Sequence, residues 1–234
     1  KKNIIEKQIE QLDIMNAKLE QQNSELENLT LRIKQYLPKQ LIEKLLVEAN
    51  EHNQTKRKKL TIFFSDIVGF TETAESLEAE TLTSLLNSYL DRMEMIASKH
   101  GGTVDKYIGD AIVIFFGDSD SKGEKQDAIA CVKMALEMQS AMVDLQQSWR
   151  NIGIEKPLHI RMGINTGFCS IGDFGSKQRK DYTAIGSEVN ITARLQTATE
   201  PDTIIISYST YALIKDEFKT DFLGDLALKG IPRK

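Results

Sequence analysis

The first 37 residues constrain the fold most, because they carry a seven-residue repeat in a segment that has no glycine and no proline before Pro38. Position d of the repeat holds an apolar side chain in every heptad: Ile5, Leu12, Leu19, Leu26 and Ile33. Position a is mixed: Ile9, Asn16, Asn23, Thr30 and Leu37. Leucine at d with asparagine at a is typical of a two-stranded parallel coiled coil, in which asparagine fixes register at a cost in stability. Residues 1–37 are therefore predicted to form a dimeric parallel coiled coil, with a single amphipathic helix as the alternative.

A connecting segment follows at residues 38–58. Pro38 should end or kink the long helix, because proline lacks a backbone N–H and clashes with the preceding turn. Gln40–Val47 is apolar enough for a short helix, and the polar, basic stretch from Glu48 is predicted to be a linker.

Residues 59–234 alternate between short apolar runs and segments with helical periodicity. The runs predicted as strands are Leu60–Phe64, Thr103–Ile108, Ala111–Phe116, His159–Ile164, Phe168–Ile171 and Thr203–Ser207. The predicted helices are Leu77–His100, Gln126–Trp149 and Glu188–Thr199. Gly109-Asp110 and Asn165-Thr166-Gly167 indicate hairpins, and residues 172–181 indicate a glycine- and charge-rich loop. This order predicts an α+β domain with sheet and helices in separate layers.

Composition excludes several classes of protein. Thirty Lys and Arg against 34 Asp and Glu give a net charge of -4, which offers no general attraction to nucleic acid or to anionic lipid. Cys131 and Cys169 lack metal-ligand spacing and are interpreted as reduced thiols, which favours a cytoplasmic location. No apolar run approaches the ~18 residues of a membrane span, so this fragment is expected to make no membrane contact. The start at Lys1 indicates a fragment of a longer protein, whose remainder could attach it to a membrane.

Two aspartates follow apolar runs. Asp66 ends the strand that begins at Leu60, and Asp110 lies at the tip of the hairpin after Ile108. If those strands are neighbours, the two carboxylates converge, and carboxylates suit hard divalent cations that bridge phosphate oxygens. The alternative is structural, because Asp66 could cap the next turn and Asp110 could simply form the hairpin.

Three motifs resemble the signatures of class III nucleotidyl cyclases, in the order in which that family has them. They are Phe64-Ser65-Asp66-Ile67-Val68-Gly69-Phe70-Thr71, Lys106-Tyr107-Ile108-Gly109-Asp110-Ala111 and Gly186-Ser187-Glu188-Val189-Asn190-Ile191-Thr192-Ala193-Arg194. The resemblance implies a ferredoxin-like or palm-type antiparallel sheet over residues 59–234. It also implies two Mg²⁺ or Mn²⁺ ions per active site, held by Asp66, Asp110 and the carbonyl of Ile67.

The resemblance further assigns the residues that contact substrate. The backbone amides of Gly69, Phe70 and Thr71 would receive the triphosphate. Arg161 would reach the terminal phosphates, unless it is a solvated strand arginine. Lys229 would be a late phosphate lysine, although the family often has a second basic residue where this chain has Ile231.

Asn190 and Arg194 are four residues apart, hence on one helical face, where they could form a mere surface pair. By resemblance they are catalytic, with the amide orienting the ribose and the guanidinium meeting charge at the α-phosphate. Lys106 occupies a position that is lysine in adenylyl cyclases and glutamate in guanylyl cyclases. Together with Thr183, which can accept from an adenine amino group, Lys106 predicts ATP as substrate.

The sequence thus predicts an adenylate cyclase that converts ATP to 3′,5′-cyclic AMP and pyrophosphate, as the output module below an upstream sensor domain. Lys106 and Asp110 lie up to ~13 Å apart by strand rise, and the resemblance implies that they serve different sites shared across a homodimer. A guanylate cyclase and a catalytically silent dimerising module are the alternatives. A diguanylate cyclase is disfavoured, because Ile108-Gly109-Asp110 stands where that class has a Gly-Gly-[Asp/Glu]-[Asp/Glu]-Phe turn.

Overall fold

The structure is a computed structural model that describes residues 2–34, 42, 55–154, 156–176 and 178–226. The chain divides into two units, Lys1–Asn50 and Glu51–Lys234.

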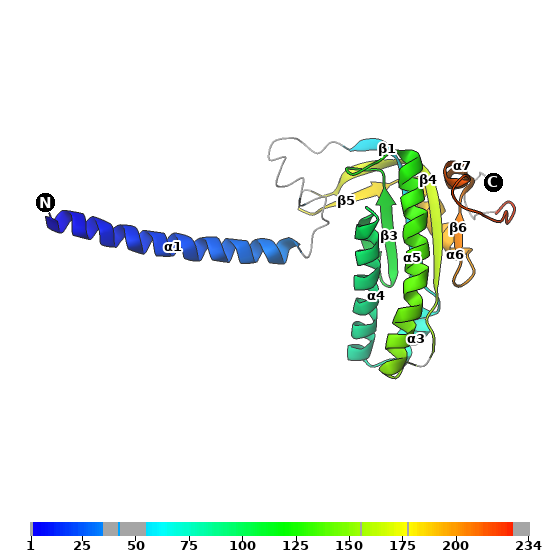
Figure 1. Cartoon of the computed structure of the whole chain (residues 1–234), viewed down its shortest axis with the longest axis horizontal. Coiled ribbons are helices and arrows are strands. Elements are labelled where there is room, and N and C mark those ends of the chain that lie inside the picture. The colour runs from blue at the N-terminus through cyan, green and yellow to red at the C-terminus, as the bar shows by residue number, and fades with distance from the viewer. Residues whose placement is uncertain (1, 35–41, 43–54, 155, 177, 227–234) are drawn as a thin grey trace. The chain divides into compact units, whose positions relative to one another are not determined.

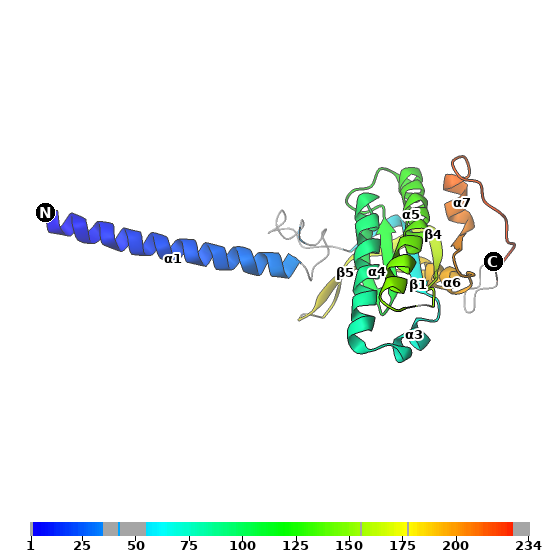
Figure 2. The same ribbon diagram turned by 60° about the horizontal axis from the view of Figure 1, so that its bottom comes forward.

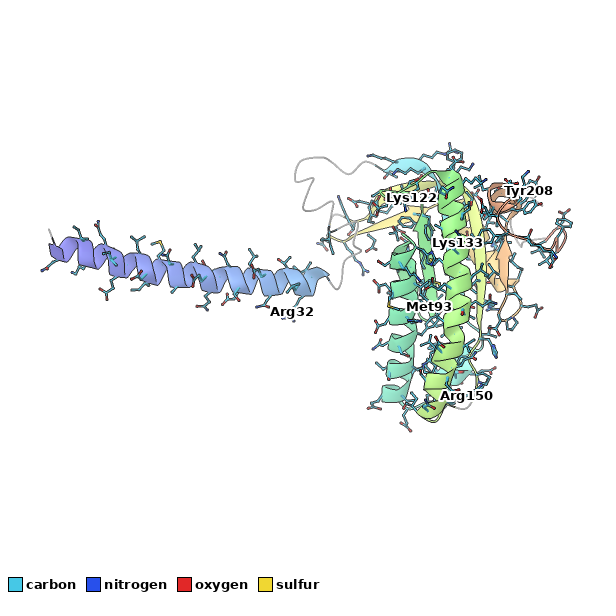
Figure 3. The ribbon with its side chains drawn as sticks, viewed as in Figure 1. Arg32, Met93, Lys122, Lys133, Arg150 and Tyr208 are labelled. Carbon is cyan, nitrogen blue, oxygen red and sulfur yellow. The ribbon has the colours of Figure 1, made fainter. Side chains whose placement is uncertain are left out.

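The first unit contains one long helix, α1 (Lys2–Lys34) (Figure 1). Figure 3 shows its side chains projecting on all sides, among them the labelled Arg32. The predicted seam is open to solvent in the single chain, since Leu12 is 58% exposed and Leu26 is 61% exposed. The predicted helix is confirmed, and the coiled coil stays a prediction. Leu37, Pro38 and most of the predicted helix at Gln40–Val47 lie outside the described residues.

The second unit is built on a sheet of six strands: β1 (Lys56–Ile67), β2 (Thr103–Ile108), β3 (Ala111–Phe116), β4 (Ile160–Gly175), β5 (Lys180–Ile185) and β6 (Ile204–Ile206). Their order is β2-β3-β1-β4-β5, and all four of those pairings are antiparallel. The short β6 pairs with β4 in parallel. The predicted antiparallel sheet is confirmed, and β1 begins three residues before the predicted domain start at 59.

The predicted second hairpin at Asn165-Thr166-Gly167 is wrong, because these residues lie inside the continuous strand β4. Tertiary contacts outweigh the turn preference of these residues. The Asn165 amide donates to Glu188, and the Thr166 hydroxyl lies 2.9 Å from that of Thr61 on β1. A Cβ at Gly167 would come within 2.6 Å of the Glu188 side chain. The chain turns instead between β4 and β5, inside the segment that the sequence predicted as loop.

In the described part of this unit, the helices that accompany the sheet are α3 (Phe70–Ser76), α4 (Ala79–Lys99), α5 (Glu124–Asn151), α6 (Ser187–Thr197) and α7 (Tyr208–Ile214). Figures 1 and 2 both show α4 and α5 side by side across one face of the sheet. The labelled Met93 of α4 is fully buried in the core beneath them (Figure 3). The three long helices predicted from periodicity are α4, α5 and α6, with ends shifted by one to two residues.

The alternation of side chains along β4 shows that α6 covers the opposite face from α4 and α5. Ile160, Met162 and Ile164 lie in the core that α4 and α5 cover. Gly163, which alternates with them, lies against α6, and a Cβ there would be 2.5 Å from the backbone nitrogen of Gln196. Glycine at 163 is therefore required for the close approach of α6 to the sheet.

No helix in the described part of the chain combines the length and the apolar character needed to cross a membrane. Both cysteines are free and buried.

Candidate active site

Asp66 and Asp110 come together at the end of β1. The side chain of Asp110 accepts a hydrogen bond from the backbone N–H of Ile67 at 2.8 Å, which ties the β2-β3 turn to β1. The turn is a two-residue connection in which Gly109 has φ of 65°, a conformation that glycine adopts without strain. The β2-β3 hairpin lies beside β1, because β3 pairs with β1. The two aspartates therefore converge, as the sequence predicted for neighbouring strands.

Arg161 lies directly opposite Asp66, because β4 pairs with β1 in that register. Its Nε donates to Oδ1 of Asp66 at 2.8 Å and its Nη2 donates to Oδ2 at 3.0 Å, which makes a bidentate ion pair. Hydrogen bonds to Asp66 raise the pKa of the Arg161 guanidinium above its usual value, so the arginine stays charged. A cation is thus already held against Asp66, on the face of the sheet that α6 covers.

Partial burial and the nearby Asp66 carboxylate raise the pKa of Asp110, while the N–H of Ile67 and the charge of Arg161 oppose that rise. Burial is the largest of these causes. A carboxylate that is penalised by burial and by a like charge gains from a cation placed between the two acids. This donor set fits hard divalent cations, because it offers only oxygen ligands.

Within the described ranges, no group of three or more His, Cys, Asp or Glu side chains could hold a metal ion. The two aspartates would thus supply two carboxylates, and further ligands would have to come from backbone carbonyls, water or a bound phosphate. That composition is typical of Mg²⁺ sites that bind a nucleotide triphosphate.

The residues predicted to receive the triphosphate follow Asp66 at once. Gly69 adopts φ of 69° and caps the start of α3, whose first two residues are Phe70 and Thr71. The turn is closed by a hydrogen bond from Thr73 N to Gly69 O at 3.2 Å. Lys229, the last predicted phosphate ligand, lies outside the described residues.

Lys106 and Thr183 are brought together although 77 residues separate them in sequence. The Lys106 ammonium donates to the Thr183 hydroxyl at 2.9 Å, from β2 across to β5. Thr183 is 5% exposed, whereas the Lys106 side chain is 44% exposed. The pair predicted to recognise the base therefore exists as a contact within one chain.

Asp105 was not predicted from the sequence. Its Oδ2 accepts from the Thr183 hydroxyl at 3.0 Å and lies 3.3 Å from the Lys106 ammonium. The strand pairing shifts between Val104 and Lys106, so Asp105 is an extra residue and can share the side of the strand that Lys106 occupies. Burial raises the pKa of Asp105, and the Thr183 hydrogen bond and the Lys106 charge oppose that rise. The signal that could have found it is an acid beside a site lysine, but alternation along a regular strand places such neighbours on opposite faces.

Asn190 and Arg194 lie on α6, one turn apart, as predicted. Asn190 is exposed, whereas Nη1 of Arg194 is buried and has no hydrogen-bond partner within the described part of the chain. Buried guanidinium N–H groups are normally paired, so this nitrogen is available to an acceptor such as water, a ligand or a group of another chain.

The two groups of residues contact different strands. Asp110 is bonded to β1, while Lys106, only four residues earlier, is bonded to β5. Along β4, the partners of the two groups are Arg161, which pairs with Asp66, and Gly172, which pairs with Thr183. Arg161 lies near the start of β4 and Gly172 near its end, so the two groups contact opposite ends of that strand.

Comparison with known proteins gives the family. The model of the family described as "Adenylate and Guanylate cyclase catalytic domain" matches residues 52–234. The crystal structure of the adenylyl cyclase CyaB from P. aeruginosa has a TM-score of 0.76 and 55% identity, and the match covers 77% of this chain and 92% of that one. The guanylyl cyclase Cya2 has a TM-score of 0.72 and 34% identity, covering 76% and 88% of the two chains.

Among curated proteins, adenylate cyclase 1 of Rhizobium meliloti is 27% identical over 198 residues, which is 83% of this chain and 29% of that protein. The chain spans between 8% and 30% of the length of the first three curated relatives that it matches. The match of the family model covers the sheet, Asp66, Asp110 and the Lys106–Thr183 contact. The chain therefore belongs to the family of adenylate and guanylate cyclase catalytic domains.

Proposed function

We propose that this chain is the catalytic output module of an adenylate cyclase, which converts ATP to 3′,5′-cyclic AMP and pyrophosphate. The family contains both adenylate and guanylate cyclases, so the choice of base needs its own argument. The observation that carries the choice is the hydrogen bond between Lys106 and Thr183.

An ammonium can donate to N1 of adenine, which has a lone pair, but not to N1 of guanine, which carries a hydrogen. A hydroxyl oxygen beside it can accept from the adenine 6-amino group. Lys106 and Thr183 together thus offer a donor and an acceptor in the order that adenine needs. The 55% identity to an adenylyl cyclase is in keeping with this choice.

Asp66, Asp110 and the carbonyl of Ile67 would hold two divalent ions, Mg²⁺ or Mn²⁺. When bound, such ions neutralise the triphosphate charge and make the ribose 3′-hydroxyl a better nucleophile. Because Asp66 is paired with Arg161, we propose that the guanidinium turns from Asp66 to the terminal phosphates when nucleotide binds. The amides of Gly69, Phe70 and Thr71, together with Lys229, would complete the phosphate contacts.

Asn190 would orient the ribose, and Arg194 would stabilise the negative charge that develops at the α-phosphate during displacement. The unpartnered Nη1 of Arg194, which finds no acceptor among the described residues, supports this role, because a phosphate oxygen is an acceptor for a buried guanidinium. A catalytically silent module would be expected to lack one of these groups, and this chain has all of them.

We further propose that the active sites are shared between two copies of the chain, with metals from one protomer and with Lys106, Thr183, Asn190 and Arg194 from its partner. A two-fold axis then creates two equivalent sites. Residues 1–37 would form the parallel coiled coil, residues 38–58 the coupling segment and residues 59–234 the catalytic domain. A parallel coiled coil could carry a rotation or a shift from an upstream sensor to the dimer.

The proposed function is tested by incubating the purified chain with ATP or GTP and either Mg²⁺ or Mn²⁺, and then separating cyclic nucleotide from pyrophosphate. We expect cyclic AMP and pyrophosphate in equal amounts, with a higher kcat/KM for ATP than for GTP under matched metal conditions. A preference for GTP would make the chain a guanylate cyclase. No product from either nucleotide, with a folded dimer, would favour the silent module.

A second prediction concerns the coiled coil. Replacing Leu12, Leu19 and Leu26 together by Ser should raise the dimer dissociation constant at least about a hundredfold, because each buried leucine contributes roughly 1.5–3 kcal/mol. Activity should fall at nanomolar protein and recover as the protein concentration rises. Ultracentrifugation and activity measured over a concentration series check both effects.

The matched control replaces Ile14 and Leu31 by Ser. These residues are also exposed on α1, at 64% and 60%, but lie off the seam. The control should leave dimerisation unchanged. Activity of the seam variant that is independent of concentration while the protein is monomeric would contradict the shared sites.

A further inference from the structure

Asp105 contacts both Lys106 and Thr183 at the proposed base site, and the proposed function does not use it. Asp105 has a side chain that is only 1% exposed, yet it carries a carboxylate. Its Oδ2 contacts both Thr183 and Lys106, while its Oδ1 is buried. Burying a carboxylate costs free energy, and an apolar residue at the same position would avoid that cost.

The hydrogen-bonding capacity of the Thr183 hydroxyl defines what Asp105 can do. A hydroxyl has one hydrogen to donate and two lone pairs to accept with, so Thr183 alone could donate to O6 of guanine as readily as it accepts from the adenine amino group. Base selection by Thr183 therefore depends on where its single hydrogen points. The Lys106 ammonium, 3.3 Å from Oδ2, favours the ionised form of Asp105, which has no hydrogen to give and can only accept.

The geometry around the hydroxyl fixes that direction. Thr183 Oγ1 lies 3.0 Å from Asp105 Oδ2, and the other neighbouring acceptor, the carbonyl of Ala184, is 3.5 Å away. The stronger, charge-assisted bond goes to Asp105. Lys106 donates to the same hydroxyl oxygen at 2.9 Å, which uses one lone pair. One lone pair of Thr183 remains for a ligand, and no hydrogen does.

We propose that Asp105 is a specificity-determining residue that acts through Thr183, by holding the threonine hydroxyl as a hydrogen-bond acceptor toward the base. This inference rests on the proposed function, in which Thr183 faces the 6-position of the purine. A 6-amino group donates to the remaining lone pair. A 6-oxo group is itself an acceptor, so it would face the lone pair of Thr183 with no hydrogen between them. Both acceptors would then lose a hydrogen bond, which weakens binding. Asp105 is a positioning residue and does not touch the nucleotide.

The test replaces Asp105 by Asn, which has nearly the same shape. Asparagine removes the negative charge, so the bond from the Thr183 hydroxyl to residue 105 loses its charge assistance and the threonine hydrogen becomes available to the base. We expect the ratio of kcat/KM for ATP to that for GTP to fall about tenfold or more, since a mismatched buried polar contact weakens binding by about that factor. The matched control is Asp181→Asn, because Asp181 lies on β5 two residues from Thr183 and forms its ion pair with Arg179 at 3.9 Å. The control ratio should equal that of the unaltered protein.

A parallel loss of activity with both nucleotides, at an unchanged ratio, would overturn the proposal and leave Asp105 a structural role. A preference of the unaltered protein for GTP would instead sink the proposed function, so the two failures are distinct.

A second measurement needs no variant and decides the matter if Asp105→Asn does not fold. Purine riboside 5′-triphosphate lacks the 6-amino group of ATP. If Thr183 accepts from that group, the analogue should have a kcat/KM about tenfold lower than ATP. If the hydrogen of the Thr183 hydroxyl pointed at the base, it would face the hydrogens of the 6-amino group and repel them. The analogue would then react as well as ATP or better. That second result would overturn the proposal.

Discussion

Asp66→Asn and Asp110→Asn are each expected to lower turnover at least about a thousandfold while the protein stays folded, because each removes a charge that metal binding needs. In Asp110→Asn, the new amide oxygen could still accept from the N–H of Ile67, so the link between the turn and β1 should survive. Asp66→Asn weakens the bidentate ion pair with Arg161, whose two side chains are 29% and 21% exposed, so a drop of about 1 kcal/mol in the free energy of unfolding is expected. Turnover at saturating ATP with Mg²⁺ or Mn²⁺, and thermal unfolding followed by circular dichroism, measure the two properties separately.

The matched control for these variants is Asp216→Asn. Asp216 is also paired with a basic residue, Lys125 at 3.4 Å, but on the surface and away from the site. Its activity should be unchanged. Full activity of Asp66→Asn or Asp110→Asn at limiting Mg²⁺ would remove that carboxylate from the metal site. A large drop in the unfolding temperature would show that the residue is structural.

The shared-site architecture predicts that Asp66→Asn and Arg194→Ala, each nearly inactive alone, recover activity when they are co-expressed. In a heterodimer, one composite site receives both defects, while the other pairs an intact Asp66 with an intact Arg194. Random pairing makes about half of the dimers heterodimeric, each with one intact site of two, so activity should reach roughly a quarter of the unaltered value. Two different affinity tags isolate the heterodimer, in which the expected activity is about half.

The control for recovery is the pair Asp66→Asn and Asp110→Asn. Both residues belong to the metal-binding half of the site, so every composite site in their heterodimer carries one defect. No recovery is expected from this pair. Should the Asp66→Asn and Arg194→Ala heterodimer also stay inactive, both residues would serve one site within a single chain, and the shared-site mechanism would fail.

Local patterns in the sequence predicted much of the second unit. The apolar spacing of Leu77–His100 and Gln126–Trp149 corresponds to α4 and α5, because an amphipathic period needs only one apolar neighbour to become a packed helix. Gly109-Asp110 specified a tight turn through its own backbone preferences. The convergence of Asp66 and Asp110 followed from these elements, once their strands were taken as neighbours.

Local preference did not decide the structure at Asn165-Thr166-Gly167. A turn preference is a weak local energy, and in β4 it is outweighed by contacts to β1, to Glu188 and to Thr210, which are distant in sequence. The strand β5 was missed for the related reason that Lys180–Ile185 is recognisable as a strand only through its pairing with the second half of β4.

The sequence by itself determined the helix periods, the hairpin at Gly109 and the residue types that a nucleotidyl cyclase site needs. Tertiary structure alone decided which side chains hold one another, because those partners come from strands far apart in the chain. Arg161 became the partner of Asp66 through the register of β4 on β1. Asp105 reached Thr183 because an irregularity in β2 displaced it from the regular alternation of a strand. Strand register and bulges depend on the summed packing of many residues, and no single motif in the sequence encodes that sum.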